Sequence, residues 1–137
     1  MKLIPLLVLS SVSMVSHEPT WTFERSGLAA SLVEPSMQEP PLRLACGRPG
    51  YLEIEILAGA KQQEVTLIAP SKIALTLRGT QTAPDRITSN VYFKSITAEF
   101  FRDEGEIEVL GGHSYRLHLK GARSVLQTLE SSCTTVS

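Results

Sequence analysis

The chain has 137 residues, of which 42% are apolar and 20% are charged, and its formal net charge is -1. This length is sufficient for one domain with a sizeable core and too short for two comfortable ones. The lysines and arginines are scattered, and no basic run alternates with aromatic residues, which argues against a nucleic-acid-binding surface. We therefore expect a single domain and no nucleic-acid partner.

The first residues have the pattern of an export signal. Lys2 precedes an uncharged, mostly apolar stretch over residues 3–16, and a charged, proline-containing segment follows at 17–19. This pattern predicts a secretory signal peptide over residues 1–16, cleaved after Ser13 or, less favourably, after Ser16. The alternative is a retained N-terminal helix, although the stretch is shorter than the roughly 20 residues that span a bilayer. Residues 17–137 should then form a domain that is periplasmic or secreted, where disulfides persist.

The next part of the chain alternates apolar and polar side chains, the pattern of half-buried strands. Leu42, Leu44 and Cys46 share one face of a predicted strand. Residues 51–57 form a second alternating stretch, in which Glu53 and Glu55 should face water. We expect both apolar faces to point into the core.

Turn residues separate these strands and several others. Arg48-Pro49-Gly50 places proline and glycine as a type II turn requires, so the two strands should form a hairpin. The side chains around Trp21 alternate as well, and a proline-rich loop follows at 34–41. Further strand candidates lie at 28–33, 64–70, 72–79, 90–101, 106–112 and 114–121. About eight short strands at this spacing predict a mainly β fold, a single antiparallel β-sandwich, with a barrel as the alternative.

The end of the chain has the period of a helix. Ala122, Val125, Leu126, Leu129 and Cys133 would form one apolar stripe, which predicts one short helix over about 121–133, packed on the sheet.

The same stripe predicts a disulfide. The chain has 2 cysteines, and Cys46 and Cys133 should both face the core. In an oxidising compartment we therefore expect them to be bonded to each other. Such a bond would close a loop of about 90 residues and stabilise the fold by on the order of 4 kcal/mol.

The order of elements also resembles a group of small exported bacterial proteins. A strand of the form L-x-L-x-C is followed by a β-meander and then by G-x-x-x-x-L-x-x-L-x-x-x-C. Here the residues are Leu42, Leu44 and Cys46, then Gly121, Leu126, Leu129 and Cys133. The arrangement is similar to the periplasmic accessory proteins of type VI secretion (the VasI/TagO type) and to the invasion-associated protein B type. The resemblance implies a β-domain of the cell envelope without catalytic activity.

No residues have the spacing of a metal site. His113 and His118 are five positions apart, so they would lie on opposite faces of a regular strand. Neither CxxC nor HExxH occurs. The acidic run at 103–108 could suggest calcium, but Gly105 suits a hairpin turn and the following glutamates suit the solvated face of a strand. We expect no metal and no cofactor.

Catalytic motifs are missing from the sequence as well. No GxSxG motif occurs, and Ser71 and Lys72 are adjacent, so they would project to opposite sides of a strand. Glu53 and Glu55 share a face, as a catalytic carboxylate pair requires, but on the open side of a hairpin. We expect the protein not to be an enzyme.

Two functions remain open. The first is an exported, non-enzymatic interaction module of the bacterial cell envelope that presents loops or a strand edge to another envelope or secreted protein. The alternative is a small periplasmic inhibitor of an envelope-attacking enzyme such as lysozyme, which the size and the predicted disulfide suit. The segment GGHSYR at 111–116 is loosely similar to the SGxxY loop of one such inhibitor family, but lacks the leading serine and a following tryptophan.

Overall fold

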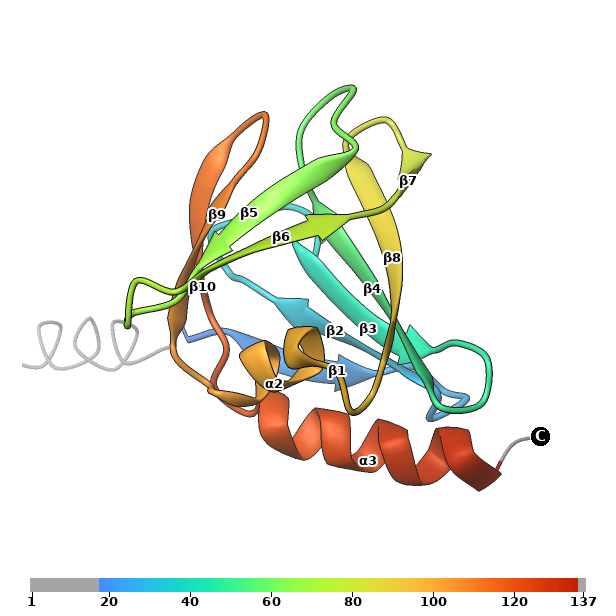
Figure 1. Cartoon of the computed structure of the whole chain (residues 1–137). Coiled ribbons are helices and arrows are strands. Elements are labelled where there is room, and N and C mark those ends of the chain that lie inside the picture. The colour runs from blue at the N-terminus through green and yellow to red at the C-terminus, as the bar shows by residue number, and fades with distance from the viewer. Residues whose placement is uncertain (1–17, 136–137) are drawn as a thin grey trace, which may run out of the picture.

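A computed structural model describes residues 18–135, which form two antiparallel sheets and two helices (Figure 1). The six-stranded sheet has the order β1-β2-β3-β4-β8-β7, and the four-stranded sheet has the order β10-β9-β5-β6. The strands are β1 (Thr20–Phe23), β2 (Ala29–Val33), β3 (Leu42–Cys46), β4 (Tyr51–Leu57), β5 (Glu64–Ile68), β6 (Ala74–Arg78), β7 (Thr80–Ala83), β8 (Arg86–Tyr92), β9 (Glu106–Leu110) and β10 (Ser114–His118). The helices are α2 (Ile96–Arg102) and α3 (Ala122–Thr135).

The predicted fold class is confirmed: the protein is mainly β, with antiparallel sheets and a C-terminal helix. Residues 18–135 contain ten strands, where the sequence predicted about eight. The predicted signal peptide at 1–16 lies outside the described residues. Within 18–135, neither helix has the length and apolar character that spanning a bilayer requires.

The core lies between the two sheets, on the faces that the alternation predicts. Leu44 of β3 pairs with Ile54 of β4, and Leu67 of β5 pairs with Val109 of β9. All four side chains are fully buried. Because burying one such side chain contributes about 1.5–3 kcal/mol, a one-residue slip of either pair would be costly.

The chain passes from one sheet to the other at Gly79, between β6 and β7. A Cβ at this position would lie 2.4 Å from the carbonyl oxygen of Thr88 on β8. Only glycine permits so close an approach of two backbones, so it marks the bend where the sheets meet.

The predicted β3–β4 hairpin is confirmed, with Cys46 opposite Leu52. The backbone N–H of Tyr51 donates to the carbonyl of Arg48 at 2.8 Å, and Gly50 has a φ of +86°. A type II turn requires positive φ at its third residue, which glycine adopts without strain.

Helix α3 lies along one end of the molecule and packs against β3 (Figure 1). Its predicted stripe is confirmed: Leu126 and Leu129 are fully buried, Cys133 is nearly so, and Gln127 is exposed. The helix begins at Ala122 and runs two residues beyond the predicted end. The stripe therefore supplies the contact that a helix of this length needs for stability.

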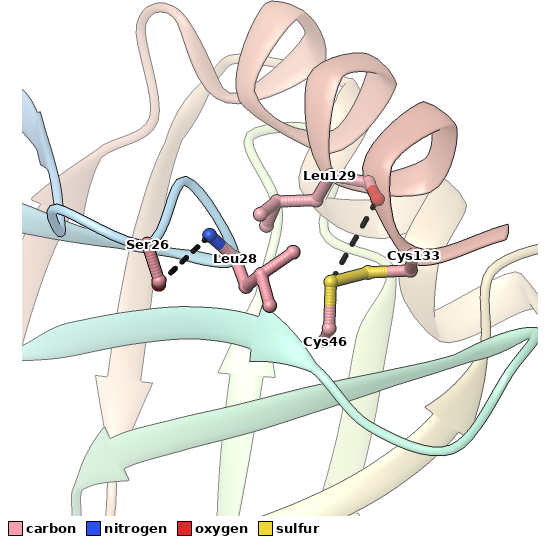
Figure 2. Close-up of a disulfide and its surroundings, with 5 residues drawn as sticks. All are labelled: Ser26, Leu28, Cys46, Leu129 and Cys133. Carbon is pink, nitrogen blue, oxygen red and sulfur yellow. Dashed lines mark hydrogen bonds between the residues drawn. A yellow bond between two sulfur atoms is a disulfide. The ribbon is translucent and has the colours of Figure 1, made fainter. Parts of the chain in front are cut away.

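The predicted disulfide joins this helix to the sheet. Cys46, at the end of β3, is bonded to Cys133 over a sequence separation of 87, with a Cα–Cα distance of 5.5 Å. Figure 2 shows the carbonyl oxygen of Leu129 pointing toward the Cys46 sulfur, 3.9 Å away. The bond thus fixes the last part of α3 against the end of β3.

One predicted strand, over residues 90–101, is wrong in its second half. Strand β8 ends at Tyr92, and α2 follows. The hydroxyl of Ser95 accepts a hydrogen bond from the N–H of Ala98 at 3.2 Å, which caps the helix. Ala98 and Phe101, three positions apart, are its buried residues. After the cap at Ser95, the buried residues therefore follow the spacing of a helix and no longer alternate as in a strand.

Candidate functional site

The carboxylates on the outer face of the six-stranded sheet belong to a charged cluster. The Nε of Arg43 lies 2.7 Å from Glu24, and its Nη1 lies 3.5 Å from Glu53 and 3.9 Å from Glu55. The Nη1 of Arg86, whose side chain is only 9% exposed, lies 3.7 Å from Glu55. The hydrogen bond from Arg43 lowers the pKa of Glu24.

Glu53 and Glu55 lie on the outer face of the sheet, as predicted. Their side chains are only partly exposed, at 33% and 25%. The sequence did not predict this partial cover, which arises because the arginines of neighbouring strands lie over the same face. Both carboxylates are paired with arginine, which is the arrangement of a structural cluster.

The histidines and the acidic run do not come together. His113 precedes β10 and His118 ends it, and both are exposed. The carboxylate of Glu104 accepts a hydrogen bond from the N–H of Arg123 at 3.1 Å, at the start of α3. Glu106 pairs with Arg116 at 3.4 Å. Across residues 18–135, no three histidine, cysteine or acidic side chains are grouped as metal ligands.

Ser71 and Lys72 lie in the turn between β5 and β6, and not on a strand as predicted. The N–H of Lys72 donates to the carbonyl of Ala69, and the N–H of Ala69 to the carbonyl of Ile73, both at 2.9 Å. Lys72 has a φ of +75°, which the tight turn imposes. Both side chains are exposed, and the two residues form part of this turn.

The segment 111–116 forms the turn between β9 and β10 and the start of β10. Tyr115 is half-buried, and its hydroxyl donates to the carbonyl of Leu57 at 2.5 Å. Burial raises the pKa of Tyr115. Its hydroxyl is therefore already engaged within the fold.

An aromatic stack lies at the end of the six-stranded sheet beside the β3–β4 turn. Tyr51 and Tyr92 are cross-strand neighbours whose ring centroids are 4.3 Å apart. The guanidinium carbon of Arg48 lies 4.2 Å from the centroid of the Tyr51 ring, a cation–π contact. A side-chain hydrogen bond with Tyr92 raises the pKa of Tyr51.

Next to this stack is a hollow of about 450 Å³, which we call the tyrosine hollow. It is lined by Gly50, Tyr92, Phe93, Lys94, Ser95 and Glu130. Phe93 is buried, whereas Tyr92 is 59% exposed. The N–H of Phe93 donates to the carbonyl of Gly50 at 3.1 Å, which joins the β3–β4 turn to the end of β8.

The disulfide joins two of the elements that contribute residues to the tyrosine hollow. Cys46 ends the strand that leads into the turn with Gly50, and Cys133 follows Glu130 by three residues on α3. Gly50 and Glu130 both line the hollow. The bond therefore ties the strand that leads into the turn with Gly50 to the helix that carries Glu130.

A second hollow, of about 270 Å³, lies between α2 and the β5–β6 turn, and we call it the isoleucine groove. Ile73, Ile96 and Phe100 line it together with charged side chains that include Glu99, Asp103 and Arg123. Ile96 is 82% exposed and Ile73 is 64% exposed. The groove and the tyrosine hollow adjoin at the start of α2, because Ser95 lines one and Ile96 the other.

The exposed apolar side chains gather around α2. Within residues 18–135 five large hydrophobic residues are exposed, and three of them, Tyr92, Ile96 and Ile73, line these two hollows. We call the tyrosine hollow and the isoleucine groove together the α2 surface. Exposed apolar side chains that cluster in one region mark interaction sites more often than isolated ones do.

No model of a known protein family, no curated protein and no solved structure matches this chain.

The α2 surface is a site that the sequence did not predict. Tyr51 and Tyr92 are 41 positions apart in the chain and meet only through the pairing of β4 with β8. Ile96 was placed in an alternating strand, where one face would have been buried. A usable signal was Ser95 followed by an apolar residue and, four positions on, by Glu99, a pattern of helix starts.

Proposed function

We propose that this protein is an exported, non-enzymatic interaction module of the bacterial cell envelope and that it binds another envelope or secreted protein through the α2 surface. The observation that carries the proposal is the gathering of Tyr92, Ile96 and Ile73 around one short helix. Aromatic residues and arginine are enriched where proteins bind each other. The neighbouring Arg48 and Tyr51 fit that composition.

Two further features support the proposal. The Cys46–Cys133 bond suits a compartment outside the cytoplasm, because thiols inside it are kept reduced. The helix that carries Ile96 is also anchored in the core, since Phe101 of α2 is fully buried. A pre-organised surface loses less conformational entropy on binding than a mobile one.

The test is capture of partners from an envelope extract with three immobilised proteins: the wild type, Ile96→Ser and Val33→Ser. Val33 is a matched control because it is also an exposed aliphatic residue, at 38%, on β2 and outside both hollows. We expect a protein that is captured by the wild type and by Val33→Ser and lost with Ile96→Ser. Identical sets of captured proteins for all three would contradict the proposal.

The inhibitor interpretation gains no support from the segment that suggested it. Tyr115 of the 111–116 segment is half-buried, and its hydroxyl bonds to Leu57. It is therefore not a free side chain that could enter an enzyme cleft. A lysozyme inhibition assay on the same preparation gives the direct comparison, and we expect no inhibition.

A further inference from the structure

We propose that the tyrosine hollow binds an acidic segment of the partner protein, with an apolar side chain of that segment in the hollow and its carboxylates at Arg48 and Lys94. The inference rests on the proposed function and adds the chemistry of the partner. It follows from the shape of the hollow, its apolar floor and the distribution of charge around it.

The hollow is large enough and apolar enough for a side chain of a partner. Its volume of about 450 Å³ falls in the range of ligand pockets, about 300–1,000 Å³. Phe93 is buried at its base and Tyr92 offers an exposed ring. An aromatic or large aliphatic side chain would therefore leave water and contact two rings.

Among the described residues, the cations beside the hollow have no carboxylate partner. Ion pairs of residues 18–135 involve Arg43, Arg78, Arg86, Arg102 and Arg116, but neither Arg48 nor Lys94. Lys94 lines the hollow, and Arg48 lies on the ring of Tyr51, next to Tyr92. Both side chains are exposed and can therefore meet an approaching anion.

The one carboxylate in the lining does not cancel the two cations. Glu130 lies 3.4 Å from the Nη2 of Arg102, which it shares with Glu99 at 2.9 Å. Even when Glu130 is counted in full, Arg48 and Lys94 leave one net positive charge at the hollow, although the whole chain has a formal net charge of -1. Complementary charge directs association and selects partners more than it adds affinity, so an acidic partner is favoured over a basic one.

The isoleucine groove provides a contrast within the same surface. Its rim carries Glu99 and Asp103 as well as Arg102 and Arg123, so acidic and basic groups are balanced. Charge selection should therefore arise at the tyrosine hollow, while the groove contributes apolar contact.

The experiment uses three synthetic peptides with blocked ends: Asp-Glu-Phe-Glu-Asp, the same peptide with alanine in place of phenylalanine, and Lys-Lys-Phe-Lys-Lys. Binding is measured by NMR titration of the oxidised protein at low salt. We expect the first peptide to bind at least about tenfold more tightly than either of the others, with shifts at Tyr92 and Lys94, and to weaken as salt is added.

Charge-reversed variants complete the experiment. Arg48→Glu with Lys94→Glu should abolish the preference for the acidic peptide. The control, Lys61→Glu with Lys120→Glu, makes the same change in net charge at exposed lysines that line neither hollow, and should keep the preference.

Three results would overturn the inference: equal binding of the acidic and basic peptides, equal binding of the phenylalanine and alanine peptides, or a preference that survives reversal of Arg48 and Lys94. These results are separate from the capture experiment. If capture depends on Ile96 while peptide selection is absent, the interaction module stands and the acidic partner is wrong. If selection is present while capture ignores Ile96, the acidic-segment site at the tyrosine hollow stands and the role of the isoleucine groove in capture is wrong.

Discussion

Helices α2 and α3 pack against each other, but they differ in how many of their apolar side chains are buried. Helix α3 has 14 residues and an apolar stripe that ends in the disulfide, whereas α2 has 7 residues, buries Ala98 and Phe101 and leaves Ile96 in solvent. Two polar contacts join them: Arg102 of α2 pairs with Glu130 of α3, and Arg123 of α3 donates to the carbonyl of Arg102.

The difference indicates a division of roles. Helix α3 buries its apolar side chains in the core, so substitutions of them should lower the stability of the fold. Helix α2 buries Ala98 and Phe101 and exposes its outer side to solvent. Substitutions on that outer side should alter binding and leave stability almost unchanged. Each of the following experiments tests one side of this contrast.

The largest effect should come from the disulfide that holds α3. Cys46→Ser and Cys133→Ser should each lower the free energy of unfolding by about 4 kcal/mol, because either change removes the same closure of a long loop. The double variant should lose little more than either single variant, since the two residues share one interaction. Urea denaturation measures all three.

Thiol titration of the unfolded, unreduced wild type is the control for this prediction. It should find no reactive thiol. Two reactive thiols would show that Cys46 and Cys133 are free in the protein and that α3 is held by packing alone.

The apolar stripe of α3 should come next. Leu126→Ala and Leu129→Ala should each destabilise the protein by about 3 kcal/mol, because both side chains are fully buried and alanine would leave a cavity. Gln127→Ala, on the exposed side of the same helix, is the matched control and should change stability by less than about 0.5 kcal/mol. Equal losses at Leu129 and Gln127 would mean that the helix is rotated relative to the sheet.

A smaller effect is expected at the cap of α2. Ser95→Ala removes the acceptor for the N–H of Ala98 and a donor to the carbonyl of Tyr92, and should cost about 1 kcal/mol. Ser95→Asp keeps a capping acceptor and should recover most of that loss. Stability unchanged by Ser95→Ala would indicate that Phe101 alone fixes the helix.

The smallest effect on stability, and the largest on binding, should come from the outer side of α2. Ile96→Ser should change the free energy of unfolding by no more than about 0.5 kcal/mol, because the isoleucine is 82% exposed. Thermal denaturation of the wild type and of Ile96→Ser, the same proteins as in the capture experiment, measures this change in stability. A loss of several kcal/mol would place Ile96 in the core and remove the contrast between the two helices.

The sequence alone determined the features that depend on local period and on short motifs. Alternation assigned the core faces of β3 and β4, and Arg48-Pro49-Gly50 specified their turn. Helical spacing assigned α3 and turned Cys133 toward the sheet, where it meets Cys46. These predictions succeed because the direction of a side chain follows directly from the backbone conformation of its own segment.

Tertiary structure decided which side chains are covered and which are presented. The apolar run at 90–101 suits either strand or helix locally, and its division between β8 and α2 depends on the Ser95 cap and on burial of Phe101. Arg86 is charged yet buried, and Ile96 is apolar yet exposed. Exposure is set by what other segments pack against a residue, and those contacts join positions far apart in the chain, so no local pattern contains them.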